Sequence, residues 1–195
     1  MRWLSTCLVA GLLLLSGCTN WIVGDSITFI AEQQLEGSNP STQVDADAGR
    51  GAHLVGLGGL PDGWAAVLQR LPQVSAGQWL VVELGTNDLD RPAAEWSTFV
   101  TAVAQRLPND RCLAWVTPYH PMKVAQAAAY EKIVRLALLR QPCRAVIHWD
   151  DAARAHPELT KDGYHPNTKG AAALTCMINA VLYRSCTTPF AITRP

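Results

Sequence analysis

The sequence lacks an excess of charge of either sign. Its 195 residues include 16 Lys and Arg against 16 Asp and Glu, so the formal net charge is zero. Nucleic-acid-binding proteins carry basic surfaces, and this composition shows no basic field. Repeats, low-complexity tracts and linkers are also missing, and 49% of the residues are hydrophobic, which excludes a disordered chain. We therefore expect no nucleic-acid partner and a single domain, because a chain of this length is too short for two ordinary cores.

The sequence also lacks the cysteine and histidine spacing of a zinc site. It has six cysteines, but no Cys-x-x-Cys pair and no cluster of histidines, so we expect no metal. Cys112 and Cys143 each precede an apolar, strand-like run, and neighbouring parallel strands begin side by side. In an exported chain we therefore expect the disulfides Cys112–Cys143 and Cys176–Cys186. The alternative is four free buried cysteines in a reducing compartment.

No apolar run near the amino terminus is long enough to span a bilayer comfortably. Arg2 precedes a run from Trp3 to Leu15, a pattern typical of an export signal. The run ends in Leu-Ser-Gly-Cys at residues 15–18, which resembles a bacterial lipobox. We expect residues 1–18 to be a signal peptide and residues 19–195 one domain. With a lipobox, Cys18 would be lipidated and the protein would be held in the cell envelope. With an ordinary signal, the protein would be secreted. An uncleaved amino-terminal helix is a further alternative.

Apolar runs of strand length alternate with longer stretches of helical periodicity. This alternation predicts an α/β protein with a parallel sheet covered by helices. The expected strands are Trp21–Val23, a short one around Val44, Trp79–Leu84, Leu113–Thr117 and Ala145–Trp149. The expected helices are Ile27–Gln34, Asp62–Leu71, Ala93–Leu107, Lys123–Leu139 and Asn167–Leu182.

Polar and glycine-rich segments follow the expected strands. In parallel sheets, ligands bind beyond the carboxyl ends of the strands, so these segments are where a site is expected. They are Gly24-Asp25-Ser26, Ala48-Gly49-Arg50, Gly85-Thr86-Asn87-Asp88, Pro118-Tyr119-His120 and the later Asp162-Gly163-Tyr164-His165-Pro166. We expect all five to meet at one edge of the sheet.

Ser26 is a candidate nucleophile. It follows an apolar strand and Gly24 and opens a helix, so its backbone N–H is free to stabilise a developing oxyanion. A serine hydroxyl needs a base within hydrogen-bond reach and a carboxylate that orients the base. Asp162 and His165, two residues apart in a Gly-containing turn, match these roles. Taken separately, Asp25-Ser26 is more typical of a helix N-cap, and Asp162-Gly163 of an ordinary turn, than of a catalytic site.

Asn87 and Gly49 are candidate oxyanion-hole donors. Asn87 offers a side-chain amide directly after a strong strand, and Gly49 offers a backbone N–H after the second strand. Either segment taken alone is also compatible with a simple turn.

The four blocks together resemble the SGNH (GDSL) hydrolase family. The blocks are Gly24-Asp25-Ser26, Gly49, Gly85-Thr86-Asn87-Asp88 and Asp162-Gly163-Tyr164-His165-Pro166, in the family's order over nearly the whole mature chain. The resemblance implies a flavodoxin-like, three-layer α/β/α fold with a five-stranded parallel sheet and no metal or organic cofactor. It also implies a Ser26–His165–Asp162 triad, an oxyanion hole of Ser26, Gly49 and Asn87, and a structural role for Asp25.

The sequence lacks Gly-x-Ser-x-Gly, which disfavours the α/β-hydrolase fold. We expect a monomeric esterase that acts on acyl or acetyl esters of small molecules or glycans. Because Cys18 and Ser26 would lie at opposite ends of the first strand, about 20 Å apart, the site would face away from a membrane. We expect the pocket walls at residues 54–60, 89–96 and 119–125, where Trp96 and Tyr119 are either glycan platforms or packing residues.

Two alternative functions remain at this stage. The segment from His148-Trp149-Asp150 to His165 is similar to SGNH domains of envelope O-acyltransferases, which implies acyl transfer to a glycan, or its deacetylation, through the same acyl-enzyme. The other alternative is an envelope-binding lipoprotein without catalytic activity.

Overall fold

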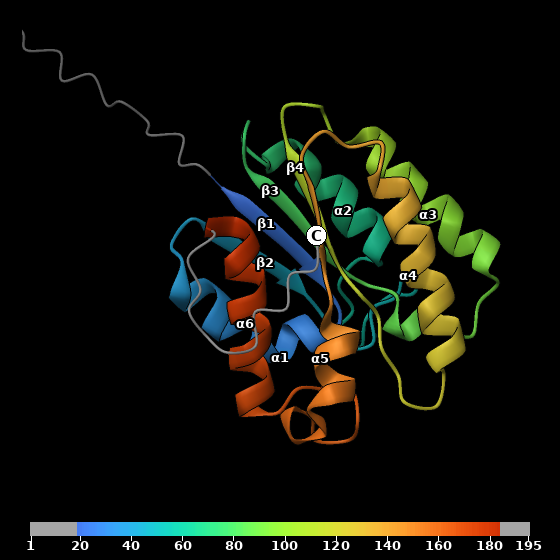
Figure 1. Cartoon of the computed structure of the whole chain (residues 1–195). Helices are drawn as coiled ribbons and strands as arrows, with labels where there is room; N and C mark the ends of the chain where they lie inside the picture. The colour runs from blue at the N-terminus through green and yellow to red at the C-terminus, as the bar shows by residue number, and fades with distance from the viewer. Residues whose placement is uncertain (1–18, 184–195) are drawn as a thin grey trace, which may run out of the picture.

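The computed structural model describes residues 19–183, and it folds as a parallel sheet between two layers of helices (Figure 1). The strands are β1 (Asn20–Gly24), β2 (Thr42–Ala46), β3 (Trp79–Glu83), β4 (Cys112–Val116) and β5 (Arg144–Ile147). The α-helices are α1 (Ser26–Ser38), α2 (Gly63–Arg70), α3 (Ala93–Arg106), α4 (Val124–Leu138), α5 (Trp149–Ala155) and α6 (Thr168–Tyr183). Three short 3₁₀ turns complete the set: η1 (Leu71–Gln73), η2 (Thr86–Asp88) and η3 (Pro157–Leu159).

The strand order of the sheet is β2-β1-β3-β4-β5, and every neighbouring pair is parallel. The chain steps from β1 outward to β2 and then returns past β1 to β3, so the direction of winding changes between β1 and β3. A crevice forms at such a switch point, beyond the carboxyl ends of the strands. Ser26 follows β1 and Asn87 follows β3, so both stand at this position.

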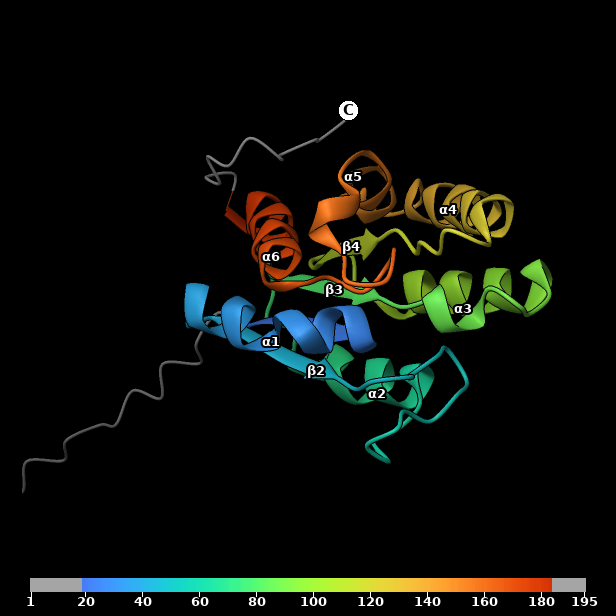
Figure 2. The same cartoon turned by 90° about the horizontal axis from the view of Figure 1, so that it is seen from below.

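Each face of the sheet has its own apolar core. Helices α2, α3 and α4 pack on one face around Trp96, Phe99 and Trp115. Helices α1, α5 and α6 pack on the other face around Ile22, Ile27 and Trp149, as Figure 2 shows. Because both faces are covered, the central strands are apolar on successive residues, as in Leu80-Val81-Val82, all fully buried.

The predicted three-layer fold is confirmed, with one local correction. The last strand was expected to run from Ala145 to Trp149, but β5 ends at Ile147 and Trp149 begins α5. Asp150 and Asp151 lie in the first turn of this helix, where carboxylates interact favourably with the free N–H groups. Three alanines follow within the helix, so helix propensity and charge override the apolar run that suggested a strand.

A disulfide joins Cys112 to Cys143, with the two Cα atoms 4.7 Å apart, as predicted. Cys112 begins β4 and Cys143 immediately precedes β5, so the bond links these strands at the amino edge of the sheet. The other predicted pairing involves Cys186, which lies outside the described residues. The predicted signal peptide with Cys18 lies outside them as well. Among residues 19–183, no helix combines the length and apolar character that crossing a membrane requires.

Candidate active site

Ser26 lies at the sharp turn between β1 and α1. Asp25 is the N-cap residue of α1, and its Oδ1 accepts a hydrogen bond from the Ile27 amide at 2.9 Å. Gly24 is required here, because a Cβ at this position would overlap the Thr28 side chain. As the first residue of α1, Ser26 has a backbone N–H that no described residue accepts. The turn therefore holds a hydroxyl and an unpaired backbone donor together at the carboxyl edge of the sheet.

The turn before α6 brings a histidine and a carboxylate to the same hydroxyl. Asp162 Oδ1 accepts the His165 backbone N–H at 2.9 Å, and Gly163 adopts a φ of 98°, which allows the chain to fold back. Asp162 Oδ2 lies 2.7 Å from His165 Nδ1, and His165 Nε2 lies 2.9 Å from Ser26 Oγ. The structure therefore aligns Asp162, His165 and Ser26 in one hydrogen-bonded chain.

Asp162 is held as a carboxylate by these contacts. Burial opposes ionisation of Asp162, but hydrogen bonds from the side chain and backbone of His165 lower the pKa of the carboxyl below its usual value. An ionised Asp162 keeps the proton of the imidazole on Nδ1, which leaves Nε2 free to accept the proton of Ser26.

Gly49 and Asn87 follow β2 and β3, the two strands that flank β1, and their N–H donors differ in hydrogen-bonding state. Gly49 has a φ of 78°, and no described residue accepts its backbone N–H. The Asn87 amide nitrogen, in contrast, donates to Asp25 Oδ2 at 3.1 Å and to the Arg50 carbonyl at 2.9 Å. The Ser26 and Gly49 donors are thus free for a ligand, whereas Asn87 has to exchange one partner to reach an oxyanion.

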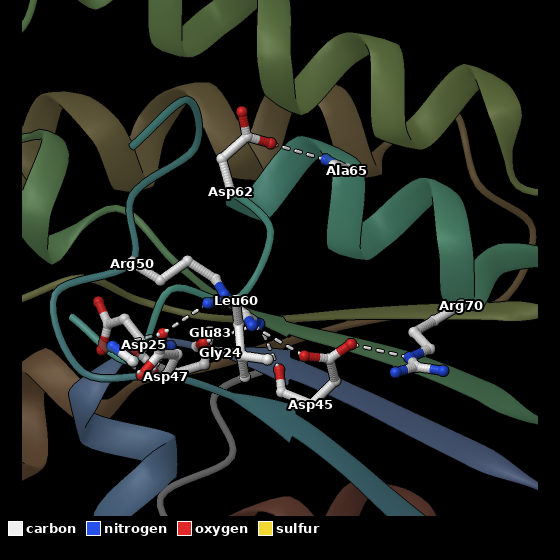
Figure 3. A network of polar contacts seen from close by, with 11 residues as sticks. Gly24, Asp25, Asp45, Asp47, Arg50, Leu60, Asp62, Ala65, Arg70 and Glu83 are labelled. Atoms are coloured by element: carbon white, nitrogen blue, oxygen red, sulfur yellow. Dashed lines mark hydrogen bonds and ion pairs between the residues drawn. The ribbon is translucent and has the colours of Figure 1, made fainter. Parts of the chain in front are cut away.

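Arg50 holds the Gly49 turn in place from inside the protein (Figure 3). Its side chain is fully buried and forms an ion pair with Asp45 at 2.9 Å. A further nitrogen of the guanidinium donates to the Asp45 carbonyl at 2.7 Å and to the Gly24 carbonyl at 3.4 Å. Asp45 is also paired with Arg70 of α2 at 2.8 Å. Since Arg50 contacts the ends of β1 and β2, it fixes the turn that follows β2 relative to Ser26.

A second buried acidic residue, Glu83, lies at the end of β3 next to Asp25. Its Oε2 accepts hydrogen bonds from the Thr28 hydroxyl at 3.0 Å and from the Thr28 and Asp25 amides at 3.2 and 3.3 Å. Both carboxyl groups are completely buried. Burial raises the pKa of Asp25 to about 6, and burial together with the nearby Asp25 charge raises the pKa of Glu83 well above its usual value. Burial therefore favours the protonated form of Glu83 beside Asp25.

The aromatic residues near the site differ from those expected. Trp96 and Tyr119 are only 2% and 6% exposed, so both are packing residues and neither is a glycan platform. Instead, the half-buried Tyr164 ring lies between two histidines, with ring centroids 4.5 Å from His120 and 4.1 Å from His165. Burial and the nearby Lys123 charge lower the pKa of His120, which favours its neutral form.

One group in the described part of the chain has metal-ligand composition: His148, Asp150 and Asp151. Its central carboxylate is already engaged, because Asp150 accepts the Thr117 hydroxyl at 2.5 Å and pairs with Arg154 at 3.3 Å. These contacts tie α5 to the end of β4. The group is thus explained by structural hydrogen bonds.

Sequence reasoning missed Glu83, and it placed Arg50 and Tyr164 at the expected site only as members of longer segments, without a role of their own. One signal for Glu83 was available: it is an ionisable residue inside the apolar run Trp79–Leu84, directly before Gly85. A carboxyl in a central strand has to find a buried partner. Arg50 and Tyr164 carried no comparable signal, because arginine and tyrosine are common in surface turns.

The fold and the site geometry define a class: an α/β protein with a serine, a histidine and a carboxylate aligned at the carboxyl edge of a parallel sheet. A model of the GDSL-like Lipase/Acylhydrolase family matches residues 22–173. The chain belongs to this family, and it is a hydrolase that acts on ester bonds. A comparison with curated protein sequences finds no match.

Solved structures share the fold at low sequence identity. The C-terminal catalytic domain of Streptococcus pneumoniae peptidoglycan O-acetyltransferase A has a TM-score of 0.66 at 19% identity, covering 85% of this chain and 93% of that chain. A GDSL-family lipolytic protein from Veillonella parvula has a TM-score of 0.67 at 11% identity, covering 86% and 99%. The psychrotrophic esterase EstA from Pseudoalteromonas sp. has a TM-score of 0.65 at 15% identity, covering 86% and 98%.

Proposed function

We propose that this protein is a serine esterase that cleaves carboxylic esters through an acyl-enzyme formed on Ser26. The observation that carries this proposal is the hydrogen-bonded chain from Asp162 through His165 to Ser26 Oγ, with distances of 2.7 and 2.9 Å. It supplies the nucleophile, the general base and the orienting carboxylate that acyl transfer requires.

In the acylation step, Ser26 Oγ attacks the ester carbonyl carbon while His165 Nε2 takes the hydroxyl proton. The tetrahedral intermediate collapses, the bond to the alcohol oxygen breaks, and His165 gives its proton to the leaving alcohol. In deacylation a water molecule attacks the acyl-enzyme, and His165 takes a proton from the water and returns it to Ser26. The acid is released and the enzyme is restored. Asp162 stabilises the imidazolium form of His165 in both halves of the cycle.

The oxyanion of each intermediate would bind the amides of Ser26 and Gly49 and the side chain of Asn87. The first two N–H groups are unpaired in the structure, which supports their assignment. The Asn87 amide would move from one of its present acceptors, Asp25 or the Arg50 carbonyl, to the oxyanion. A lost oxyanion-hole donor typically costs about 3 kcal/mol of transition-state stabilisation.

Acyl transfer to a glycan hydroxyl, or removal of an acetyl group from a glycan, is the second candidate. Half-buried Tyr164 and His120 lie next to His165, where the departing or accepting alcohol must be, and aromatic rings of this kind pack against sugars. The fold shared with a peptidoglycan O-acetyltransferase domain is compatible with this reaction. Hydrolysis and transfer differ in whether water or an alcohol resolves the acyl-enzyme, so ester products formed in the presence of a soluble chito-oligosaccharide would distinguish them.

We also propose that the protein is exported and acts in the cell envelope or outside the cell. The Cys112–Cys143 disulfide supports this location, because disulfides persist mainly in oxidising compartments. The leader of residues 1–18, with Cys18 as the proposed lipidation site, is the second support.

The experiment that tests the esterase proposal compares the wild-type protein with Ser26→Ala. We expect a fluorophosphonate probe to label the wild type, and p-nitrophenyl acetate turnover to fall by at least about 10³-fold in the variant together with complete loss of labelling. Circular dichroism of both proteins controls for folding. A folded wild type that neither reacts with the probe nor turns over ester would contradict the proposal and favour a binding protein.

A further inference from the structure

The loop of residues 54–60, which we call the apolar loop, gathers exposed apolar side chains. It connects β2 to α2 and contains no helix or strand. Leu54, Val55, Leu57 and Leu60 are exposed, and Leu57 reaches 86%, one of the highest values for a large apolar residue in the described chain. The remaining exposed apolar residues are spread over four helices and the turn before α4. A local concentration of this kind in a soluble domain marks a binding surface.

The apolar loop is fastened to the protein at its centre. The buried carboxylate of Asp47 accepts hydrogen bonds from the Gly58 amide at 3.0 Å and from the Leu60 amide at 3.4 Å. The Leu57 amide donates to the Ala48 carbonyl at 2.5 Å. Side chains at 56 and 58 would overlap the Asp47 carboxylate, so the two glycines allow the loop to close around it. Asp47 and Leu60, which the 3.4 Å hydrogen bond joins, are among the residues drawn in Figure 3. The exposed side chains are therefore presented on an ordered backbone.

Leu57 lies next to a proposed oxyanion donor. A Cβ placed on Gly49 would be 3.1 Å from Leu57 Cγ, so this side chain covers the outer side of the Gly49 turn. The leaving alcohol, in contrast, must lie at His165, which protonates it, and thus near Tyr164 and His120. The acyl chain and the alcohol point in different directions from the carbonyl carbon. The acyl side of the site is then the one bordered by the apolar loop.

We propose that the apolar loop binds the acyl chain of the substrate and that Leu57 selects esters with an apolar chain of several carbons over acetyl esters. This inference rests on the proposed function and specifies its substrate class. Each methylene group that becomes buried against the loop contributes about 0.8 kcal/mol, which corresponds to a roughly fourfold gain in kcat/KM per carbon until the loop surface is covered.

The test measures kcat/KM for p-nitrophenyl acetate, butyrate and octanoate at concentrations below micelle formation. We expect the wild type to prefer octanoate over acetate by at least tenfold. Leu57→Ser should lower kcat/KM for octanoate by roughly tenfold and change that for acetate by less than about twofold. The matched control is Leu136→Ser on α4, a leucine 57% exposed on a helix without site residues, which should leave the whole profile unchanged.

Fluorophosphonate labelling of every variant separates the two proposals. An unlabelled wild type would contradict the esterase itself. A labelled wild type with equal activity on the three esters, or a preference that Leu57→Ser leaves intact, would overturn the inference about the loop. Two further results would overturn the inference about the loop. If the wild type were a dimer that Leu57→Ser dissociates in sedimentation experiments, the loop would bind a second copy of the chain. If the wild type bound lipid vesicles through Leu57, the loop would bind a membrane.

Discussion

Asp25 and Glu83 place two acidic groups in the protein interior directly behind the proposed nucleophile. Asp25 caps α1 and accepts the Asn87 amide, while Glu83 accepts the amides of Asp25 and Thr28. The pair thus connects the ends of β1 and β3 with the start of α1. Two ionised carboxylates buried next to each other would repel in a medium that screens them poorly, so the arrangement favours a state in which one of them is protonated.

This pair predicts a specific dependence of stability on pH. In an unfolded chain both carboxyls have pKa values near 4, whereas in the folded protein burial raises the pKa of Asp25 to about 6 and that of Glu83 well above its usual value. Between about pH 4 and the folded values the native state binds more protons, so the free energy of unfolding contributed by the pair falls as pH rises. The contribution is complete below about pH 4 and is lost as pH increases through the folded pKa values.

Glu83→Gln isolates this effect, because the amide imitates the protonated carboxyl in shape and stays uncharged at every pH. We expect the variant to match the wild type in thermal stability at pH 5 and to exceed it at pH 8 by on the order of 1 kcal/mol. Glu95→Gln is the control, since this carboxylate is exposed and its ion pair is with half-buried Arg91. Equal destabilisation of Glu83→Gln at both pH values would show that the carboxyl is held ionised.

At the scale of single residues, the sequence predicted the three aligned side chains but not the residues that support them. Ser26, Asp162 and His165 stand in motifs whose residue types are unusual in combination. Glu83 and Arg50 act through buried contacts with backbone atoms of distant segments, and such contacts depend on how the strands are ordered in the sheet. The two hydrogen bonds donated by the Asn87 amide could not be predicted either, because their acceptors belong to residues 25 and 50, which are distant in the sequence.

At the scale of secondary structure, the strands and helices expected from hydrophobic periodicity are present, with ends shifted by a few residues. The exception is α5, a two-turn helix that follows β5 after one residue. With seven residues, the helix is too short for a helical repeat of apolar residues to be recognised in the sequence. The Thr117 hydroxyl, which bonds to Asp150, provides a tertiary contact that stabilises the start of this helix.

The Cys112–Cys143 disulfide joins two elements at the edge of the sheet opposite the site. It closes a separation of 31 residues, for which loop-closure entropy gives roughly 3–4 kcal/mol of stabilisation. We expect Cys112→Ala/Cys143→Ala to lower the melting temperature by about 10 °C in differential scanning calorimetry. Turnover per probe-labelled Ser26 should remain unchanged at 20 °C. Loss of turnover at that temperature in a folded variant would mean that the bond also positions the site.

At the scale of the whole molecule, the first strand separates the amino-terminal end of the described chain from the site. Asn20 begins β1 and Gly24 ends it, a distance of about 13 Å, and Ser26 follows after one residue. A membrane attachment before Asn20 would therefore leave the site facing the solvent.

A tethered form of the protein tests this orientation. With residues 1–18 replaced by a histidine tag bound to nickel-chelating vesicles, we expect soluble-ester turnover within about twofold of the free protein. Hydrolysis of phospholipid in the same vesicles should be slower by at least about 100-fold, because the site cannot reach the packed acyl esters. Similar rates on both substrates would contradict the orientation. A carboxy-terminal tag is the matched control for the effect of attachment itself.

Ser26 and His165, which lie within hydrogen-bond distance, are separated by 139 positions in the sequence. The proposed nucleophile emerges early during translation and its proposed base only shortly before α6, so we expect every shorter nascent chain to lack esterase activity. A ribosome-bound chain that ends before residue 165 would then be unable to hydrolyse esters. For the same reason, two fragments divided in the exposed turn at Met122, each inactive alone, would regain activity only on reassembly, and catalysis would then report completed folding.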